Sequence, residues 1–207
     1  THSIVLNERT YLKTVVAVSG TQNGQQTDEY QDDYSLRRLF DGNYRQTKTT
    51  VSSTLTHKFN ARHLLRTGAY VNVMQYRFGQ REWDDDAESL VEQLRNSGSA
   101  TSLDAFAQWQ YRATDRLTLN AGAHGIYFFL NNTYSLEPRA AVKYAFNERQ
   151  SLSLGYGLHG QMQPLGVYFI KNENNELPNR DLGFSKAHHV VLSYDHNLPG
   201  NWHVKPE

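Results

Sequence analysis

The acidic run Asp84-Asp85-Asp86-Ala87-Glu88 is the stretch whose residue types first suggest metal chemistry. Carboxylate oxygens are the ligands that Ca²⁺ prefers, and an EF-hand loop spaces them in a fixed pattern. Counted from Asp84, the sixth position is Ser89, where such a loop needs Gly. The twelfth is Arg95, where the loop needs a bidentate Glu. We therefore expect a solvated acidic loop and no metal site.

The histidines and the familiar catalytic motifs lead to a similar expectation. His188 and His189 are neighbours in an expected strand, so they point to opposite faces and form no zinc pair with His196. The absence of cysteine excludes a disulfide framework and a thiolate metal site. There is no Gly-x-Ser-x-Gly elbow, phosphate loop or HExxH. We expect no catalytic residues and no cofactor.

The clearest pattern in the chain is a period of two. From Leu103 to Tyr111 the odd positions are apolar, whereas the even positions, Phe106 apart, are polar. Similar alternation predicts about ten strands, each with one apolar and one wet face. The predicted strands cover residues 2–6, 11–19, 47–59, 63–80, 103–112, 117–129, 139–146, 151–161, 188–197 and a last one from 202.

Short turns and long loops alternate between these strands. The turns lie at Asn7, Asn60, Thr114-Asp115, Asn147 and Pro199. The predicted long loops are residues 20–46, residues 83–100 with a possible helical turn at 87–95, and residues 162–187. Short turns at one end and long loops at the other are typical of membrane barrels. We predict an all-β fold, an antiparallel up-and-down segment of a transmembrane β-barrel.

The composition fits a one-layer wall better than a packed globule. Only 38% of the residues are hydrophobic, and Tyr (13) outnumbers Phe (9). The mean hydropathy of −0.69 argues against a transmembrane helix. It does not argue against a barrel, in which only alternate residues need to be apolar. Basic and acidic residues balance at 21 each, so nucleic acid is not an expected partner.

Aromatic residues recur close to the short turns, several of them on the apolar parity. Outward-facing rings at this level form the girdle by which barrels sit among lipid headgroups. They are Tyr11, Phe59, Tyr111, Tyr144, Phe146, Tyr194 and Trp202.

Both ends of the sequence suggest a piece of a longer protein. The chain starts at Thr1 with no initiator Met and no leader, and it stops at Glu207 inside an expected strand. About ten strands could close a small barrel, but these ends favour an arc of a larger one.

On these residues the chain resembles the C-terminal part of the barrel of Bacteroidetes-type TonB-dependent receptors. The likeness is strongest in residues 139–144 (RAAVKY), 152–159 (LSLGYGLH), 163–165 (QPL), 179–189 (NRDLGFSKAHH) and 202–207 (WHVKPE). It implies that residues 1–207 are a partial barrel domain, without its plug, from the outer membrane of a Gram-negative bacterium. The implied function is energised uptake of a nutrient ligand, with outer-membrane lipid, the plug domain and the TonB complex as partners.

Candidate binding residues follow from the parity that would face the barrel lumen. The lumen-facing set is Tyr70, Asn72, Asp104, Gln108, Gln110, Asn120, His124, Arg139, Lys143, His159 and Gln161. Most of these would line a wet interior and contact the plug. His159, Gln161 and Gln163 lie toward the loop end and are the predicted ligand contacts.

Two alternative functions remain open at this point. A small outer-membrane barrel of the omptin kind could carry a rim hydrolase site, with Asp84 or Asp86 near His159. A soluble ligand-binding barrel would instead turn the apolar parity inward. The long strands and the unequal loops favour the receptor barrel.

Overall fold

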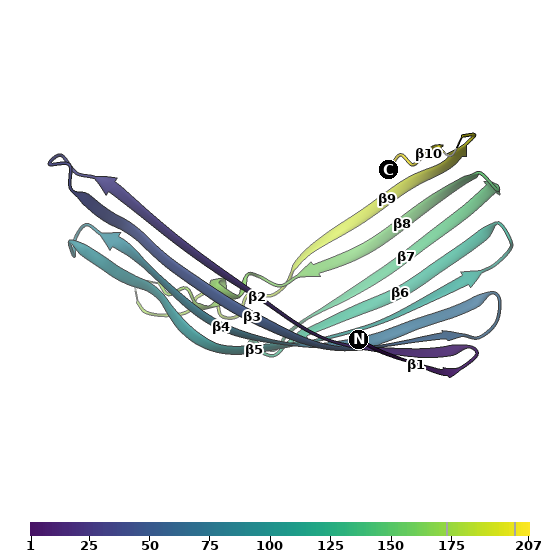
Figure 1. Cartoon of the computed structure of the whole chain (residues 1–207), viewed down its shortest axis with the longest axis horizontal. Helices are drawn as coiled ribbons and strands as arrows, with labels where there is room; N and C mark the ends of the chain where they lie inside the picture. The colour runs from purple at the N-terminus through teal and green to yellow at the C-terminus, as the bar shows by residue number, and fades with distance from the viewer. Residues whose placement is uncertain (173, 201) are drawn as a thin grey trace.

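The structure is a computed structural model that describes residues 1–172, 174–200 and 202–207. These residues form one antiparallel sheet of ten strands, in which each strand pairs with the next along the chain (Figure 1). The strands are β1 (His2–Asn7), β2 (Thr10–Tyr30), β3 (Leu36–Lys58), β4 (His63–Asp84), β5 (Ser89–Arg112), β6 (Leu117–Phe128), β7 (Thr133–Asn147), β8 (Gln150–Gln161), β9 (Ser185–Leu198) and β10 (Trp202–Val204). The predicted all-β, up-and-down antiparallel fold is confirmed.

The sheet has one apolar and one polar face, as the alternation predicts. Val16, Val51, Val71 and Leu103 are directly opposite one another on β2, β3, β4 and β5. Because successive side chains of a strand alternate between faces, this row defines what we call the apolar face, and the other side is the polar face. Side chains on the apolar face stay in the open, and Val190 of β9 is 70% exposed.

No helix within the described residues combines the length and the hydropathy needed to cross a bilayer.

The predicted loop at residues 20–46 is wrong. β2 runs on to Tyr30 and β3 begins at Leu36, so a tight turn replaces the loop. In this turn the amide of Ser35 donates to Asp33 Oδ1 at 2.9 Å, and Tyr34 has a positive φ of 63°. Polar residues on both faces conceal these strands in the sequence, because alternation marks a strand only where one face is apolar.

The predicted loop at residues 83–100, with its helical turn, is also wrong. β4 continues to Asp84 and β5 starts at Ser89. The residues expected to be helical, Leu90, Val91 and Leu94, lie in β5 instead. Consequently β2–β5 project well beyond the ends of β6–β9, toward the left of Figure 1.

The third predicted long loop is present between β8 and β9. It contains a 3-10 helix, η1 (Leu165–Phe169). The loop folds onto the polar face of β4, where the Phe169 ring stacks on Tyr76 with centroids 4.9 Å apart. The cluster around this contact is the main group of buried apolar side chains: Met74, Tyr76, Phe78, Leu94, Ala100, Phe128, Leu165, Tyr168 and Phe169.

The short turns are built alike. The side-chain oxygens of Asn7, Asn60 and Asn147 each accept a hydrogen bond from the backbone amide two residues later, at 2.8–2.9 Å. Thr114 Oγ1 does the same at 3.2 Å. This side-chain mimic of a backbone turn is what Asn and Thr supply. The predicted turns at Asn7, Asn60, Thr114-Asp115 and Asn147 are therefore confirmed, and they lie at one end of the sheet (Figure 1). The turn predicted at Pro199 includes Asn201, which lies outside the described residues.

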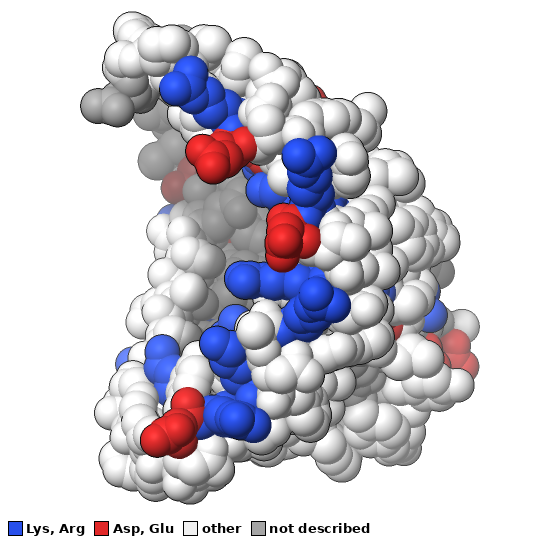
Figure 2. Space-filling view, turned by 90° about the vertical axis from the view of Figure 1, so that its right-hand side faces the viewer, with Lys and Arg blue, Asp and Glu red and all other residues white. Residues whose placement is uncertain are grey.

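Aromatic and charged side chains gather at this short-turn end. The exposed fractions of Phe59, Trp109 and Tyr144 on the apolar face are 50%, 42% and 42%. Tyr11 differs from the expected girdle because it is opposite Thr56 and Arg66 on the polar face. Seen from this end, the molecule is a crescent with Lys, Arg, Asp and Glu side chains along the part facing the viewer (Figure 2).

Candidate functional site

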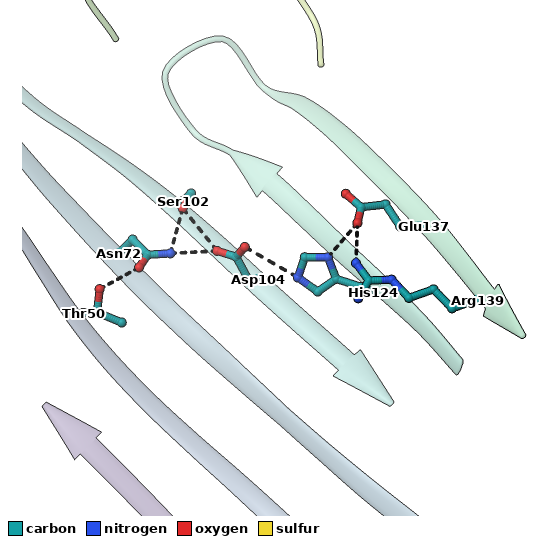
Figure 3. A network of polar contacts seen from close by, with 7 residues as sticks. All are labelled: Thr50, Asn72, Ser102, Asp104, His124, Glu137 and Arg139. Atoms are coloured by element: carbon teal, nitrogen blue, oxygen red, sulfur yellow. Dashed lines mark hydrogen bonds and ion pairs between the residues drawn. The ribbon is translucent and has the colours of Figure 1, made fainter. Parts of the chain in front are cut away.

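A continuous chain of polar contacts crosses five strands on the polar face (Figure 3). Thr50 of β3 donates from Oγ1 to Asn72 Oδ1 of β4 at 2.8 Å. The Asn72 amide donates from Nδ2 to Asp104 Oδ2 of β5 at 2.8 Å and to Ser102 Oγ at 3.1 Å. The strand register brings these groups together, because Thr50, Asn72 and Ser102 are directly opposite one another.

The second half of the network is ionic. His124 of β6 faces two carboxylates, with Nε2 3.6 Å from Asp104 Oδ1 and Nδ1 3.1 Å from Glu137 Oε2 of β7. The Arg139 guanidinium donates from Nη2 to the same Glu137 oxygen at 3.0 Å. His124 and Glu137 are paired directly across β6 and β7, so the register positions this contact as well. The network thus joins β3 to β7 on one face.

Glu137 is the most buried charged group of the network, with 2% of its surface exposed. Ser135 beside it is equally buried. Gly160 of β8 lies against both side chains, and a Cβ there would overlap Ser135 Oγ and lie 2.7 Å from Glu137 Oε1. Such distances are shorter than real Cβ contacts, so any larger residue would force the Ser135 and Glu137 side chains to shift. The fit between β7 and β8 therefore fixes the position of the Glu137 carboxylate.

A cavity of about 660 Å³ opens on the polar face above this network. Besides members of the network, its lining includes Lys48, Arg66, Tyr70 and Gln108. The cations and hydrogen-bonding groups around it make a wet surface suited to polar or charged protein groups. Both nitrogens of His124 are directed at carboxylates, which orients the ring as part of a structural network.

The three predicted ligand contacts lie elsewhere, at the loop end of β8. The His159 ring meets the His189 ring edge-on, with centroids 4.8 Å apart. Gln161 is opposite Ser185 of β9. The Gln163 side chain donates from Nε2 to Ser185 Oγ at 2.8 Å, and the backbone amide of Gln163 donates to the Tyr168 hydroxyl at 3.3 Å. These residues tie β8 to β9 and to the β8–β9 loop.

The acidic run forms the turn between β4 and β5. Asp84 Oδ1 accepts hydrogen bonds from the amides of Asp86 and Ala87, both at 2.9 Å, and Asp85 accepts one from the indole of Trp83. This turn is at the far left of Figure 1, whereas β8, which carries His159, lies in the right half.

The histidines of β9 face different neighbours. His188 meets the Tyr156 hydroxyl at 2.9 Å on the apolar face, whereas His189 lies by His159 on the polar face. His196 Nε2 is 3.2 Å from Nε2 of the Gln150 side chain. Across residues 1–172, 174–200 and 202–207, no three His, Asp or Glu side chains form a group suited to a metal ion.

The sequence pattern anticipates part of the network and misses the rest. Asn72, Asp104, His124 and Arg139 were predicted on the lumen-facing parity, and all lie on the polar face. Glu137 was not predicted, because Pro138 interrupts the alternation and the expected strand begins only after it. The available signal was the parity that Ser135, Glu137 and Arg139 share.

Comparison with known proteins finds solved structures of similar fold. No protein-family model and no curated protein matches the sequence. Among solved structures, the chain is similar to the RagAB peptide importer in its closed-closed state, with a TM-score of 0.62 and 13% identity over 96% of this chain and 27% of that one.

Two further structures give comparable values. For the siderophore receptor PirA from Pseudomonas aeruginosa the TM-score is 0.61 at 9% identity, over 98% of this chain and 43% of that one. For the copper transporter OprC it is 0.57 at 12% identity, over 93% and 34%. The chain thus spans between 27% and 43% of the lengths of these proteins. At such low identity the likeness establishes the fold alone, an all-β antiparallel up-and-down sheet that matches part of the barrels of these proteins.

Proposed function

We propose that this chain is part of the barrel of a TonB-dependent receptor that takes up a nutrient ligand across the outer membrane of a Gram-negative bacterium. The observation that carries the proposal is a band of exposed apolar side chains on one face of the sheet, to which each of the ten strands contributes. On β5 this face runs from Leu103 to Tyr111, which agrees with the roughly 9–11 residues of a membrane-spanning strand. Lipid would cover it.

The edges of the sheet support a barrel larger than this chain. β1 is opposite only Thr10 to Thr14, so the rest of β2, up to Tyr30, has β3 as its one described neighbour. A long bare strand edge is a liability that closed barrels remove. Further strands of the same protein would pair with it, as the share of the solved receptors that this chain covers suggests.

The polar face fits the inside of such a barrel. The cavity, the Thr50–Arg139 network and the β8–β9 loop are all on this face. A soluble ligand-carrying barrel would need the apolar face inside, so this arrangement disfavours it. We propose that a plug domain lies against the polar face and that the TonB complex acts through another part of the protein.

The candidate ligand-binding residues lie at the end of β8 that leads into the β8–β9 loop. We propose His159, Gln161 and Gln163 as candidate contacts, held by β9 and η1 in a region that a ligand could reach before the plug. The resemblance in residues 139–207 supports a Bacteroidetes-type receptor and a place near its C-terminus. We propose no catalytic role, because the side chain of Asp84, an acid of the alternative hydrolase site, caps its own turn.

Co-sedimentation tests the proposal. Outer-membrane vesicles from cells that produce the full-length protein containing this chain are washed with high salt and then with carbonate. Retention in the pellet is expected, because a barrel is held by apolar contact that neither wash breaks. Release of the protein by either wash would overturn the membrane assignment.

A further inference from the structure

Two arginines stand directly opposite each other on the apolar face, just beyond its hydrophobic part. Arg45 of β3 is paired with Arg77 of β4, and both are exposed. Like charges directly opposite on neighbouring strands destabilise a sheet. The pairing therefore calls for a reason outside local folding.

The register places this pair at a defined level. The last apolar row contains Val18 and Val73, and the next contains Gly20, Thr47, Gln75 and Ser99. The arginines follow in the row after that. Val73 and Arg77 are four residues apart, or about 13 Å along a strand at about 3.3 Å per residue. With the apolar rows in lipid, the arginines would lie at the level of the headgroups on the side opposite the short turns.

Neighbouring charges do not neutralise the pair. Arg81 forms an ion pair with Asp41, and its hydrogen bond lowers the pKa of that carboxyl group below the ordinary value. Arg95 lies 3.6 Å from Glu92. In the described part of the chain, Arg45 and Arg77 have neither an ion-pair partner nor a side-chain hydrogen bond. Arg81 and Arg95 therefore have acidic partners, whereas the positive charges of Arg45 and Arg77 are not compensated by a neighbouring carboxylate among the described residues.

The space beside the arginines is open. A groove of about 520 Å³ lies along this row, and its lining also includes Gln22 and Asn43. Its two carboxylates, Asp41 and Glu92, are the partners of Arg81 and Arg95. Gly79 is the next apolar-face residue of β4 after Arg77, and a Cβ built on it would meet nothing within 4 Å. A glycine inside a strand often marks a place where another molecule comes close to the backbone. The groove thus offers guanidinium and amide donors with room between them.

We propose that this groove binds a phosphate group of a phosphorylated lipid in the outer leaflet of the membrane. Guanidinium groups donate paired hydrogen bonds to phosphate, and two of them side by side match its charge. A bound phosphate would relieve the repulsion between Arg45 and Arg77. The inference rests on the proposed function, because the membrane brings the headgroup to this level.

Lipid binding by the full-length protein tests the inference. The protein is purified in detergent, and its affinity for diphosphorylated lipid A and for lipid A with both phosphates removed is measured by native mass spectrometry. The test variant is Arg45→Gln with Arg77→Gln. The control is Arg62→Gln with Arg116→Gln, which removes the same charge at the short turns. Membrane retention of each variant is measured in parallel.

We expect the test variant to bind diphosphorylated lipid A at least tenfold more weakly than the unaltered protein and the control. The dephosphorylated lipid should bind weakly to all three. Equal binding of the diphosphorylated lipid by all three, or no preference of the unaltered protein for phosphate, would overturn the inference while membrane retention still supports the barrel. Loss of the unaltered protein from membranes would overturn both.

Discussion

At the scale of single residues, the packing of the polar face depends on close contacts between residues of different strands. Glu137 is held between His124 and Arg139 and is closed in by Gly160. These neighbours come from three strands: His124 from β6, Arg139 from β7 and Gly160 from β8. The contacts of Glu137 therefore specify how β6, β7 and β8 fit together. A buried carboxylate is kept only where such partners compensate for the loss of water.

Gly160→Ala tests this fit. The added methyl group would overlap Ser135 Oγ and Glu137 Oε1, and overpacking of this kind costs about 1–3 kcal/mol of unfolding free energy. Gly183→Ala is the control, because a Cβ at Gly183 meets nothing within 4 Å. Urea unfolding of the full-length protein in lipid should separate the two variants. Equal stability would mean that β7 and β8 are not packed as described.

At the scale of elements, the sequence predicts strands well wherever one face is apolar. Residues 103–112 are predicted as a strand and lie within β5, and the short turns at Asn7, Asn60, Thr114-Asp115 and Asn147 fall at the predicted positions. The outer half of β2 could not be predicted, because residues 20–30 are polar on both faces. In the outer half of β5, Leu90, Val91 and Leu94 have a spacing that also fits a helical turn. Their strand structure comes from backbone pairing, as in the long register between Thr10 and Tyr30 of β2 and the facing residues of β3.

The β8–β9 loop makes a different kind of contact. Its position on β4 depends on aromatic packing between distant residues, for which the loop sequence alone gives no periodic signal. Phe169 is 4% exposed and stacks on Tyr76. The Arg180 guanidinium lies over the Phe169 ring, 5.4 Å from its centroid.

Phe169→Ala should therefore release the loop. Truncating a buried Phe costs about 3–5 kcal/mol, and here the loss should appear as local opening of η1. Hydrogen exchange read by mass spectrometry should show faster exchange in residues 165–169, with the strands unchanged. Ile170→Ala, at a side chain that is 39% exposed, is the control. The packing would be contradicted if both variants left exchange in η1 as it was.

At the scale of the whole molecule, the account depends on which face meets lipid. The sequence predicts the two faces from parity, and the register confirms that the apolar residues of neighbouring strands align. The network could be anticipated only in part, since parity gives the face of a residue but not its partners. The ligand follows from neither, because the fold is shared by proteins named for peptides, siderophores and copper.

Ala107→Arg places a charge on the apolar face, in the middle of the apolar stretch of β5 from Leu103 to Tyr111. In a barrel that spans a bilayer, it should cost about 2–4 kcal/mol of unfolding free energy. Gln108→Arg is the matched control, because its side chain points to the polar face and lines the wet cavity. Reversible unfolding in phospholipid vesicles measures both. A negligible effect of Ala107→Arg would count against this facing.

The most direct measurement of the central claim is a lipid-accessibility scan along β5. The chain has no cysteine, so single substitutions can carry a fluorescent label. The labels are placed by Leu103→Cys, Ala105→Cys and Ala107→Cys on one face, and by Asp104→Cys and Gln108→Cys on the other. With the full-length protein in vesicles, brominated lipid should quench the first three labels and leave the other two. Quenching of the even positions, or quenching without alternation, would contradict a membrane-spanning sheet whose apolar face meets lipid.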